Sequence, residues 1–204
     1  KVAHIKTDSI KIPDATPEII QFTMDFGKQY GYEFEHEATY DRMCLVNDAV
    51  YIAKYPDGKW TATGTQFQVP YVFKKLFSKE ELIFDDMCET KSVTSTLYLD
   101  MNENLPEGEH NYQFIGKVGR FCPIKEGCGG GILYREKEGK YYAATGSKGY
   151  RWLESEMVDK LGKQDDIDHK FYISLVDAAK ETIQKFGDFE WFVSDDPYVG
   201  PVMI

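Results

Sequence analysis

Short runs in which apolar and polar residues alternate, separated by turn residues, constrain the fold of this chain more than any other feature. Residues 2–12 alternate in this way, and the pattern predicts a β-strand. Further short runs of this kind occupy residues 32–64, where Pro56-Asp57-Gly58 predicts a tight turn between two strands. We therefore expect a hairpin or meander in this region, and an α+β fold with antiparallel sheet for the chain.

Helix-boundary residues predict where helices begin and end. Thr16 and Pro17 are typical of a helix N-terminus, because Thr can cap the first turn and Pro lacks an N–H that the first turn leaves unpaired anyway. Gly31 predicts the end of that helix. Further helices are expected at 69–77, in a short segment from Ser78, at 150–161 and at 171–186. The run FEWFV near the C-terminus is predicted to be a closing strand.

A polar stretch at 102–110, NENLPEGEH, marks a change in composition, and we interpret it as a domain boundary. This interpretation divides the chain into residues 1–66, a helical connection at 67–104, and an α+β domain with hairpins and two helices at 105–204. Within the last part, GCGGG predicts a flexible turn and Glu138-Gly139 the tip of a hairpin.

Composition limits the classes of protein. The chain has 204 residues, of which 42% are hydrophobic and 15% aromatic, and this is enough for a packed core. No stretch approaches the roughly 20 apolar residues of a membrane span, so we expect no membrane partner and a cytoplasmic location. The cysteines lack C-x-x-C spacing, which favours free thiols over a structural zinc site. Because a strand pattern is already present next to Lys1, we expect the natural N-terminus to lie upstream.

The net charge of −10 argues against a protein whose whole surface attracts nucleic acid, because phosphate binding depends on Lys and Arg. Binding of nucleic acid by a local basic face remains an alternative. Basic residues gather between positions 115 and 151 and alternate with aromatic residues: Lys117, Arg120, Lys125, Arg135, Lys140, Lys148 and Arg151, with Phe121, Tyr134, Tyr141, Tyr142, Tyr150 and Trp152.

One motif points to a family. The run H-I-K-T-D-S at 4–9 precedes a helix and then a strand-like run with an isolated tyrosine, D-A-V-Y at 48–51. This arrangement resembles the palm subdomain of family B DNA polymerases, and looks most like the divergent polymerases of bacteriophages. In that family a metal-binding hairpin carries Tyr-Gly-Asp-Thr-Asp-Ser, and a later Lys-Lys-Arg-Tyr segment touches the primer end.

The resemblance implies roles for individual residues. Asp8 matches the second aspartate of the family motif, and so would be catalytic and bind Mg²⁺, while Lys6 stands where the first aspartate is expected. Thr7 and Ser9 would support the metal ligand by hydrogen bonds. Tyr51 matches the primer-contacting tyrosine. Ala49 occupies the place of a family lysine, for which Lys54 could substitute.

The implied activity is DNA-directed DNA polymerisation, in which two Mg²⁺ ions promote transfer of a dNTP-derived nucleotide to a primer 3′-hydroxyl. One aspartate cannot hold two ions, so a partner carboxylate is expected upstream of residue 1, and this fragment alone is expected to be inactive. Residues 1–66 would then form the C-terminal part of the palm, 67–104 a palm-to-thumb connection and 105–204 a thumb-like or accessory domain. The implied DNA contacts are Lys117, Arg120, Lys148 and Arg151. A phage-encoded chain would act in the cytoplasm of a bacterial host.

Two other functions remain open. A non-catalytic nucleic-acid-binding or replisome accessory module would explain the basic segment without a complete metal site. A metal-dependent hydrolase could use Asp8 with His4 or His36, although the histidines show no ligand spacing. The glycine-rich runs at 127–131 and 146–149 could each present backbone amides to a phosphate or be simple turns, and the second precedes a predicted helix.

Overall fold

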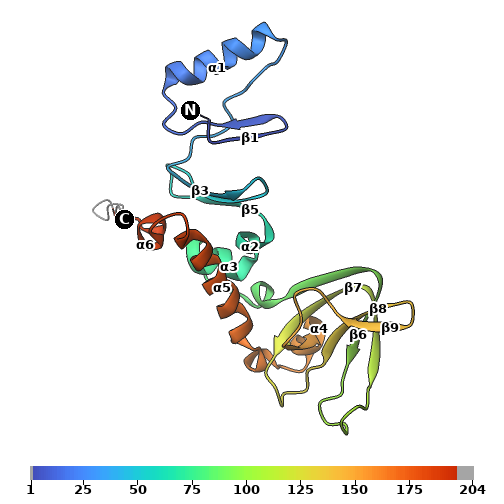
Figure 1. Cartoon of the computed structure of the whole chain (residues 1–204). Coiled ribbons are helices and arrows are strands. Elements are labelled where there is room, and N and C mark those ends of the chain that lie inside the picture. Colours follow the sequence, from blue (N-terminus) through green and yellow to red (C-terminus); the bar gives the residue numbers. More distant parts are fainter. Residues whose placement is uncertain (1, 197–204) are drawn as a thin grey trace. The chain divides into compact units, whose positions relative to one another are not determined.

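The computed structural model describes residues 2–196 and divides the chain into two compact units (Figure 1). The first unit runs to Phe67 and resumes at Thr182, whereas the second comprises Gln68–Glu181. The fold is mixed α+β, and all strand pairs within its sheets are antiparallel. Among the described residues, no helix combines the length and the apolar character that crossing a membrane requires.

The first unit contains a two-stranded hairpin, a helix, a three-stranded meander and a short C-terminal helix. In chain order these are β1 (His4–Lys6), β2 (Ser9–Lys11), α1 (Pro17–Gln29), β3 (Arg42–Asn47), β4 (Val50–Lys54), β5 (Trp60–Thr63) and α6 (Phe189–Val193). A short helix, α2 (Thr65–Gln68), follows β5.

Local chemistry explains the elements that were predicted here. Helix α1 begins at Pro17, and the hydroxyl of Thr16 accepts a hydrogen bond from the N–H of Ile19. The meander has the order β3-β4-β5, and its second turn contains Gly58 with φ 88°, a conformation that glycine adopts without strain. The strand predicted at 2–12 is instead a hairpin, because the chain reverses at Thr7-Asp8.

The prediction of a closing strand at FEWFV is wrong. This run forms helix α6, because the carboxylate of Asp188 accepts the N–H of Trp191 and so caps a helical turn. Phe189 and Phe192 are buried by this helix. At its other end, the guanidinium of Arg42 donates to the carbonyls of Trp191, Phe192 and Ser194, which satisfies backbone acceptors that the helix leaves free.

The second unit consists of a five-stranded antiparallel sheet and several helices. Its helical segments are α3 (Pro70–Phe73), a π-helical turn (Lys74–Ser78), 3₁₀ turns at Phe84–Met87 and Gln164–Asp166, α4 (Ser155–Lys160) and α5 (His169–Gln184), whose end lies in the first unit. Its strands are β6 (Glu89–Asp100), β7 (Tyr112–Ile124), β8 (Ile132–Lys137), β9 (Lys140–Ala143) and β10 (Arg151–Glu154), in the spatial order β10-β7-β6-β8-β9.

The core of this unit lies on one face of the sheet. Leu97, Leu99 and Leu133 are 0–1% exposed, and Trp152 and Tyr172 are also fully buried. Because Leu97 and Leu99 alternate with Tyr98 along β6, the tyrosine belongs to the opposite face. Burial of these large side chains provides the main stabilisation of the unit.

Three sequence-based assignments in this unit need correction. The stretch at 102–110 is not a domain boundary, because it connects β6 and β7, which pair with each other in one sheet. The helix expected at 150–161 begins only at Ser155, because residues 151–154 pair with β7 as an edge strand. No α-helix begins at Ser78: Lys79 adopts a left-handed conformation that ends the preceding helical turn, and a 3₁₀ turn follows at Phe84–Met87.

Candidate metal and nucleic-acid site

The residues of the polymerase-like motif lie at the tip of the β1–β2 hairpin. Lys6 and Ser9 are paired across the two strands, so Thr7 and Asp8 form a two-residue turn. The side chains of Lys6, Thr7 and Asp8 are exposed, and the hydroxyl of Ser9 donates to the carbonyl of Lys6 over 3.4 Å. The sequence therefore brings a carboxylate and two hydroxyls to one exposed turn.

The backbone of Thr7 is strained. Its φ angle is 36°, a left-handed value that a β-branched residue rarely adopts. Such conformations cost about 1–3 kcal/mol and persist where the surrounding structure holds them, often at functional sites. The turn that carries Asp8 therefore contains one residue in an unfavourable backbone conformation.

Two contacts connect the hairpin to the meander. At its beginning, Nε2 of the buried His4 lies 3.4 Å from Oδ1 of Asp48 in the β3–β4 turn. At its end, the ammonium of Lys11 lies over the rings of Tyr51 and Tyr40, 5.3 and 5.9 Å from their centroids. The hairpin with Asp8 and the strand with Tyr51 are thus neighbours in the first unit.

A tyrosine cluster surrounds this connection. The ring of Tyr40 lies 5.1 Å from that of Tyr55. Burial, together with the neighbouring phenols of Tyr51 and Tyr55, raises the pKa of Tyr40 well above its ordinary value. The phenol of Tyr40 therefore remains a neutral hydrogen-bond donor at any physiological pH.

Lys54 has a different position from the other candidate DNA contacts. Its side chain is buried on β4, and its ammonium lies 2.6 Å from a carboxylate oxygen of Asp195 and 3.3 Å from the carbonyl of Ser194. It also lies 5.6 Å from the centre of the Trp60 ring. A buried and paired ammonium has little capacity left for phosphate.

The fit to Mg²⁺ is partial. Mg²⁺ prefers oxygen ligands, so the exposed carboxylate of Asp8 suits it. A two-ion centre needs several carboxylates, however, and residues 2–196 contain no group of three or more His, Cys, Asp or Glu side chains that could hold a metal ion. Within this part of the chain, Asp8 supplies one ligand of such a centre and not the whole set. His4 and His36 do not complete it.

The candidate basic residues of the second unit fall into two groups. Lys117 on β7 and Lys148 in the turn before β10 are exposed, and Arg120 is an exposed residue that also lies 3.3 Å from the carboxylate of Asp85. Arg151 is partly buried and is held by Glu103, Asn102 and the carbonyl of Gly130.

The first glycine-rich run, at 127–131, is a turn whose backbone N–H groups are bonded to a side chain of the protein itself. The N–H groups of Gly127 and Gly129 donate to the carboxylate of Glu103, over 2.6 and 2.7 Å. The ammonium of Lys163 donates to the carbonyl of Cys128. An internal carboxylate thus takes the place that a bound anion would need. The second run, 146–149, precedes strand β10 and therefore has no helix N-terminus behind it.

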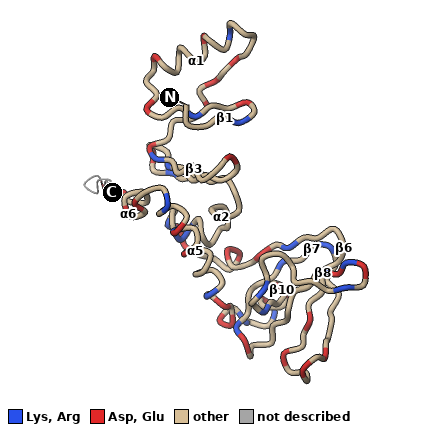
Figure 2. The backbone as a smooth tube through the Cα atoms, viewed as in Figure 1, with Lys and Arg blue, Asp and Glu red and all other residues tan. Residues whose placement is uncertain are grey.

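The structure separates the aromatic residues of the basic segment. Phe121 and Trp152 are core residues, whereas Tyr134, Tyr141 and Tyr142 are at least partly exposed on β8 and β9. The same sheet carries three further aromatic residues that the basic segment did not point to: Tyr98, Tyr112 and Phe114. The alternation of Tyr98 with Leu97 and Leu99 was the available signal. Figure 2 shows that acidic residues gather in the connection between β6 and β7.

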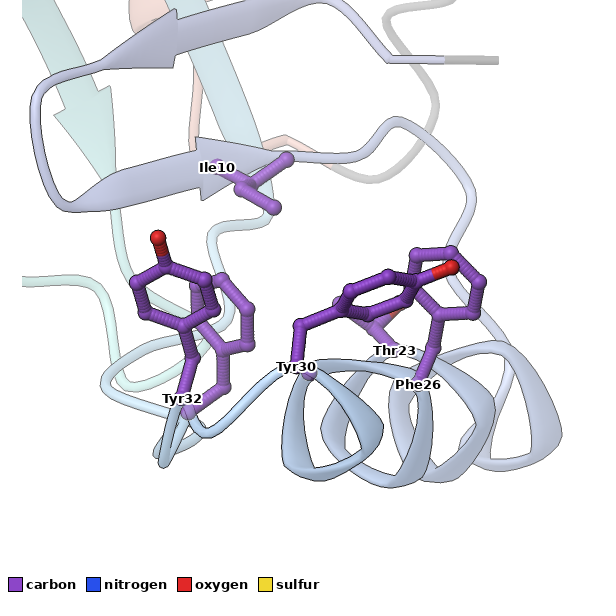
Figure 3. Close-up of a pocket in the computed structure, with 7 residues that line it drawn as sticks. Ile10, Thr23, Phe26, Tyr30 and Tyr32 are labelled. Atoms are coloured by element: carbon purple, nitrogen blue, oxygen red, sulfur yellow. The ribbon is translucent and has the colours of Figure 1, made fainter.

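A pocket of about 330 Å³ is lined by residues of β2, of α1 and of the segment that follows α1. In Figure 3, Ile10 of β2 lies on one side of the pocket, and the rings of Tyr30 and Tyr32 lie across from it. The full lining is Ile10, Thr23, Phe26, Gly27, Tyr30, Tyr32 and Phe34. Its predominantly apolar surface suits neither a metal ion nor a phosphate, so we do not include it in the candidate site.

Comparison with known proteins yields no match to a protein-family model, a curated protein or a solved structure.

Proposed function

We propose that this chain is the C-terminal part of a DNA-directed DNA polymerase related to family B, with a palm portion at 1–66 followed by a connection and a thumb-like or accessory region. The main support is the turn at Thr7-Asp8, which presents an exposed carboxylate at the tip of a hairpin. The neighbouring strand with Tyr51 gives further support, since Lys11 connects it to the hairpin. The fold alone does not distinguish a palm from other α+β arrangements.

In this proposal, Asp8 would provide one oxygen ligand for Mg²⁺. A Mg²⁺ ion held by Asp8 and further carboxylates would supply charge neutralisation at the triphosphate and would make the primer hydroxyl a better nucleophile. The Asp8 carboxylate is exposed at the turn, and the hydroxyl of Ser9 donates to the carbonyl of Lys6 at the base of the turn. Tyr51 contacts the primer end. The remaining carboxylate ligands belong to an upstream part of the same polymerase chain.

The DNA contacts proposed for the second unit are the exposed cations Lys117, Lys148 and Arg120, of which Arg120 already has an ion-pair partner. We leave Lys54 and Arg151 out of this set because their charges are paired inside the protein. Phosphate contacts of this kind position a duplex without reading its sequence.

A second candidate is a non-catalytic nucleic-acid-binding or replisome accessory module. The observation that favours it is the incomplete set of metal ligands among residues 2–196. Such a module would bind DNA without any need for Asp8, and this difference separates the two functions.

The experiment begins with the gene upstream of Lys1. The polymerase proposal requires a continuous reading frame that encodes a second carboxylate motif, and the complete chain is then expressed. We expect Mg²⁺-dependent primer extension by the complete chain and none by the 204-residue chain. Single-turnover incorporation should fall at least about a thousandfold in Asp8→Asn, which corresponds to roughly 4 kcal/mol of activation barrier, while primer-template affinity is retained.

Asp14→Asn is the matched control, because Asp14 is an exposed aspartate a few residues away and its left-handed backbone suits asparagine. This variant should extend primers like the parent. Extension by Asp8→Asn within tenfold of the parent would reduce Asp8 to a turn residue, and primer binding without any extension would favour the accessory module.

A further inference from the structure

Two of the four cysteines lie next to each other in the second unit. The sulfur atoms of Cys88 and Cys122 are 3.5 Å apart, although 34 positions separate the two residues in the chain. The other two cysteines lie elsewhere: Cys44 is on β3 of the first unit, and Cys128 is in the glycine-rich turn at 127–131. The fold of the second unit therefore brings one particular pair of thiols into contact.

The strand register explains this contact. Strands β6 and β7 are antiparallel, and the next position outward from their pair Glu89–Phe121 holds Cys88 on one side and Cys122 on the other. Facing residues of antiparallel strands have Cα atoms about 4.5–5.5 Å apart, which lies within the range of about 4.4–6.8 Å that disulfides require. The sulfurs need to approach by about 1.5 Å to reach the S–S bond length of about 2.0 Å. The backbone is therefore suited to a bond between the two thiols.

The two thiols differ in their access to solvent. Cys122 is 0% exposed and belongs to the core of the unit. Cys88 is half-buried, and its thiol donates a hydrogen bond to the carbonyl of Phe84 over 3.4 Å. A small molecule in solution can therefore reach Cys88 more readily than Cys122. Such an asymmetry is typical of pairs in which one thiol reacts first and a neighbouring thiol resolves the product.

The electrostatic surroundings keep both thiols protonated at neutral pH. Burial raises the pKa of Cys88 and of Cys122, while the guanidinium of Arg120 acts in the opposite direction. The other titratable groups that act on the pair are Asp85 of the 3₁₀ turn, Glu89 on β6 and Tyr172 on α5. Because the thiolate is the nucleophile, the pair should react slowly at neutral pH and faster as the pH rises.

We propose that Cys88 and Cys122 form a reversible disulfide when a small-molecule disulfide such as oxidised glutathione is present. The Cys88 thiolate attacks one sulfur of this oxidant, which breaks the S–S bond of the oxidant, releases one small thiolate and leaves a mixed disulfide on Cys88. The Cys122 thiolate then attacks the Cys88 sulfur and releases the second small thiolate. The two protein thiols lose two electrons, the oxidant gains them, and the two protons pass to the released thiolates.

The bond joins the beginning of β6 to the end of β7. It closes the segment 88–122, which restricts the unfolded chain and so stabilises the folded state. The ion pair between Arg120 and Asp85, at 3.3 Å, already connects the same two regions, so the bond reinforces an existing contact. The inference is independent of the proposed function, because neither thiol belongs to the hairpin with Asp8.

The test incubates the 204-residue chain with oxidised glutathione at mildly alkaline pH. Remaining thiols are then alkylated, and the chain is digested with trypsin without reduction and analysed by mass spectrometry. Trypsin places each cysteine in its own peptide: 43–54, 80–91, 121–125 and 126–135. The expected product is peptide 80–91 joined to peptide 121–125, lighter by about 2 Da than the two peptides together. Dithiothreitol should restore both thiols.

Three controls accompany this test. A double variant with Cys44→Ala and Cys128→Ala should form the same product, because it retains the pair. Cys122→Ser should stop at a mixed disulfide between glutathione and Cys88, because no thiol remains to resolve it. Oxidation of the parent in urea should remove the preference for this pair, since the preference comes from the fold. In addition, the oxidised parent should unfold at a higher urea concentration than the reduced parent.

Several results would overturn the inference, and the unmodified parent provides all of them, so no variant needs to fold. They are linked peptides that contain Cys44 or Cys128, a mixed disulfide on Cys88 that is not resolved, and four free thiols after oxidation. A urea midpoint of the oxidised parent at or below that of the reduced parent would overturn the stabilising role. Because primer extension is not measured here, failure of the polymerase proposal and failure of the disulfide are recorded separately.

Discussion

The guanidinium Nε of Arg151 lies 3.2 Å from Oε1 of Glu103, and this ion pair fixes the glycine-rich turn at 127–131. The same carboxylate accepts the N–H groups of Gly127 and Gly129, while Arg151 donates to the carbonyl of Gly130. A carboxylate and a guanidinium thus satisfy backbone groups that would otherwise attract outside partners.

This arrangement predicts that Glu103 stabilises the second unit. Glu103→Gln keeps the size of the side chain but removes the charge that two N–H groups and Arg151 share, so we expect a loss of about 1–3 kcal/mol in the free energy of unfolding. Urea denaturation measures this loss. Glu107→Gln, an exposed change in the same connection, is the control and should leave the midpoint unchanged. Equal midpoints for both variants would contradict a structural role of the carboxylate.

Lys148 is the clearest candidate for a phosphate contact to duplex DNA, because it is exposed in a turn. Lys148→Ala should weaken binding of a primer-template duplex equally for different sequences, and should reduce the slope of log affinity against log salt by about 0.9. Lys75→Ala, at an exposed lysine of the π-helical turn, provides the comparison. If both variants keep the parent slope, Lys148 is only a solvated surface residue.

Buried thiols predict a loss of stability in alkali. Burial raises the pKa of Cys44 to about 11 and also raises those of Cys88 and Cys122. The unfolded thiols ionise near pH 8.5, so above that pH the unfolded state releases protons first and is stabilised relative to the folded state. The stabilising contribution of Cys44 is complete below about pH 8.5 and is lost progressively as the pH rises to about 11.

Denaturant unfolding at pH 7.5 and 9.5 checks this prediction. The free energy of unfolding should fall between the two values, and Cys44→Ala should reduce that fall by about 1 kcal/mol, whatever its own stability at pH 7.5. Below pH 9.5 the tyrosines contribute little, because unfolded tyrosines ionise near pH 10. An identical fall in the parent and the variant would show that Cys44 is not protected by burial.

Gly27 on α1 is required by a close approach of Phe34. A Cβ atom added at Gly27 would lie 2.4 Å from Cδ2 of the Phe34 ring. Gly27→Ala should therefore lower stability by about 1–3 kcal/mol through displacement of that ring, even though alanine favours helices. Gly187→Ala, where no atom lies within 4 Å of the added Cβ, is the matched control. Thermal unfolding monitored by circular dichroism distinguishes them, and a stabilised Gly27→Ala variant would contradict the contact.

Elements that depend on local signals could be predicted from the sequence. Thr16 and Pro17 mark the start of α1, and the turn at 56–58 separates β4 from β5, because capping and turn residues act over a few positions. The run FEWFV and residues 151–154 could not be assigned, since a short apolar run fits a strand or a helix and only tertiary pairing decides. The reversal at Thr7-Asp8 was not predicted, because the alternation of apolar and polar residues in 2–12 also fits a single strand, and the pairing of Arg151 with Glu103 depends on side chains 48 positions apart.

The path of the chain through the two units determines which part of the protein could be removed or replaced as a block. The chain leaves the first unit after Phe67 and returns at Thr182, and the amide of Gln66 donates to the hydroxyl of Thr182 over 2.8 Å. The two crossing points are therefore adjacent, so the whole of Gln68–Glu181 has the topology of a guest inserted into a host. A short linker in its place would leave the path of the host intact, and the guest could be lost, replaced or diversified without interrupting the segment that carries Asp8 and Tyr51.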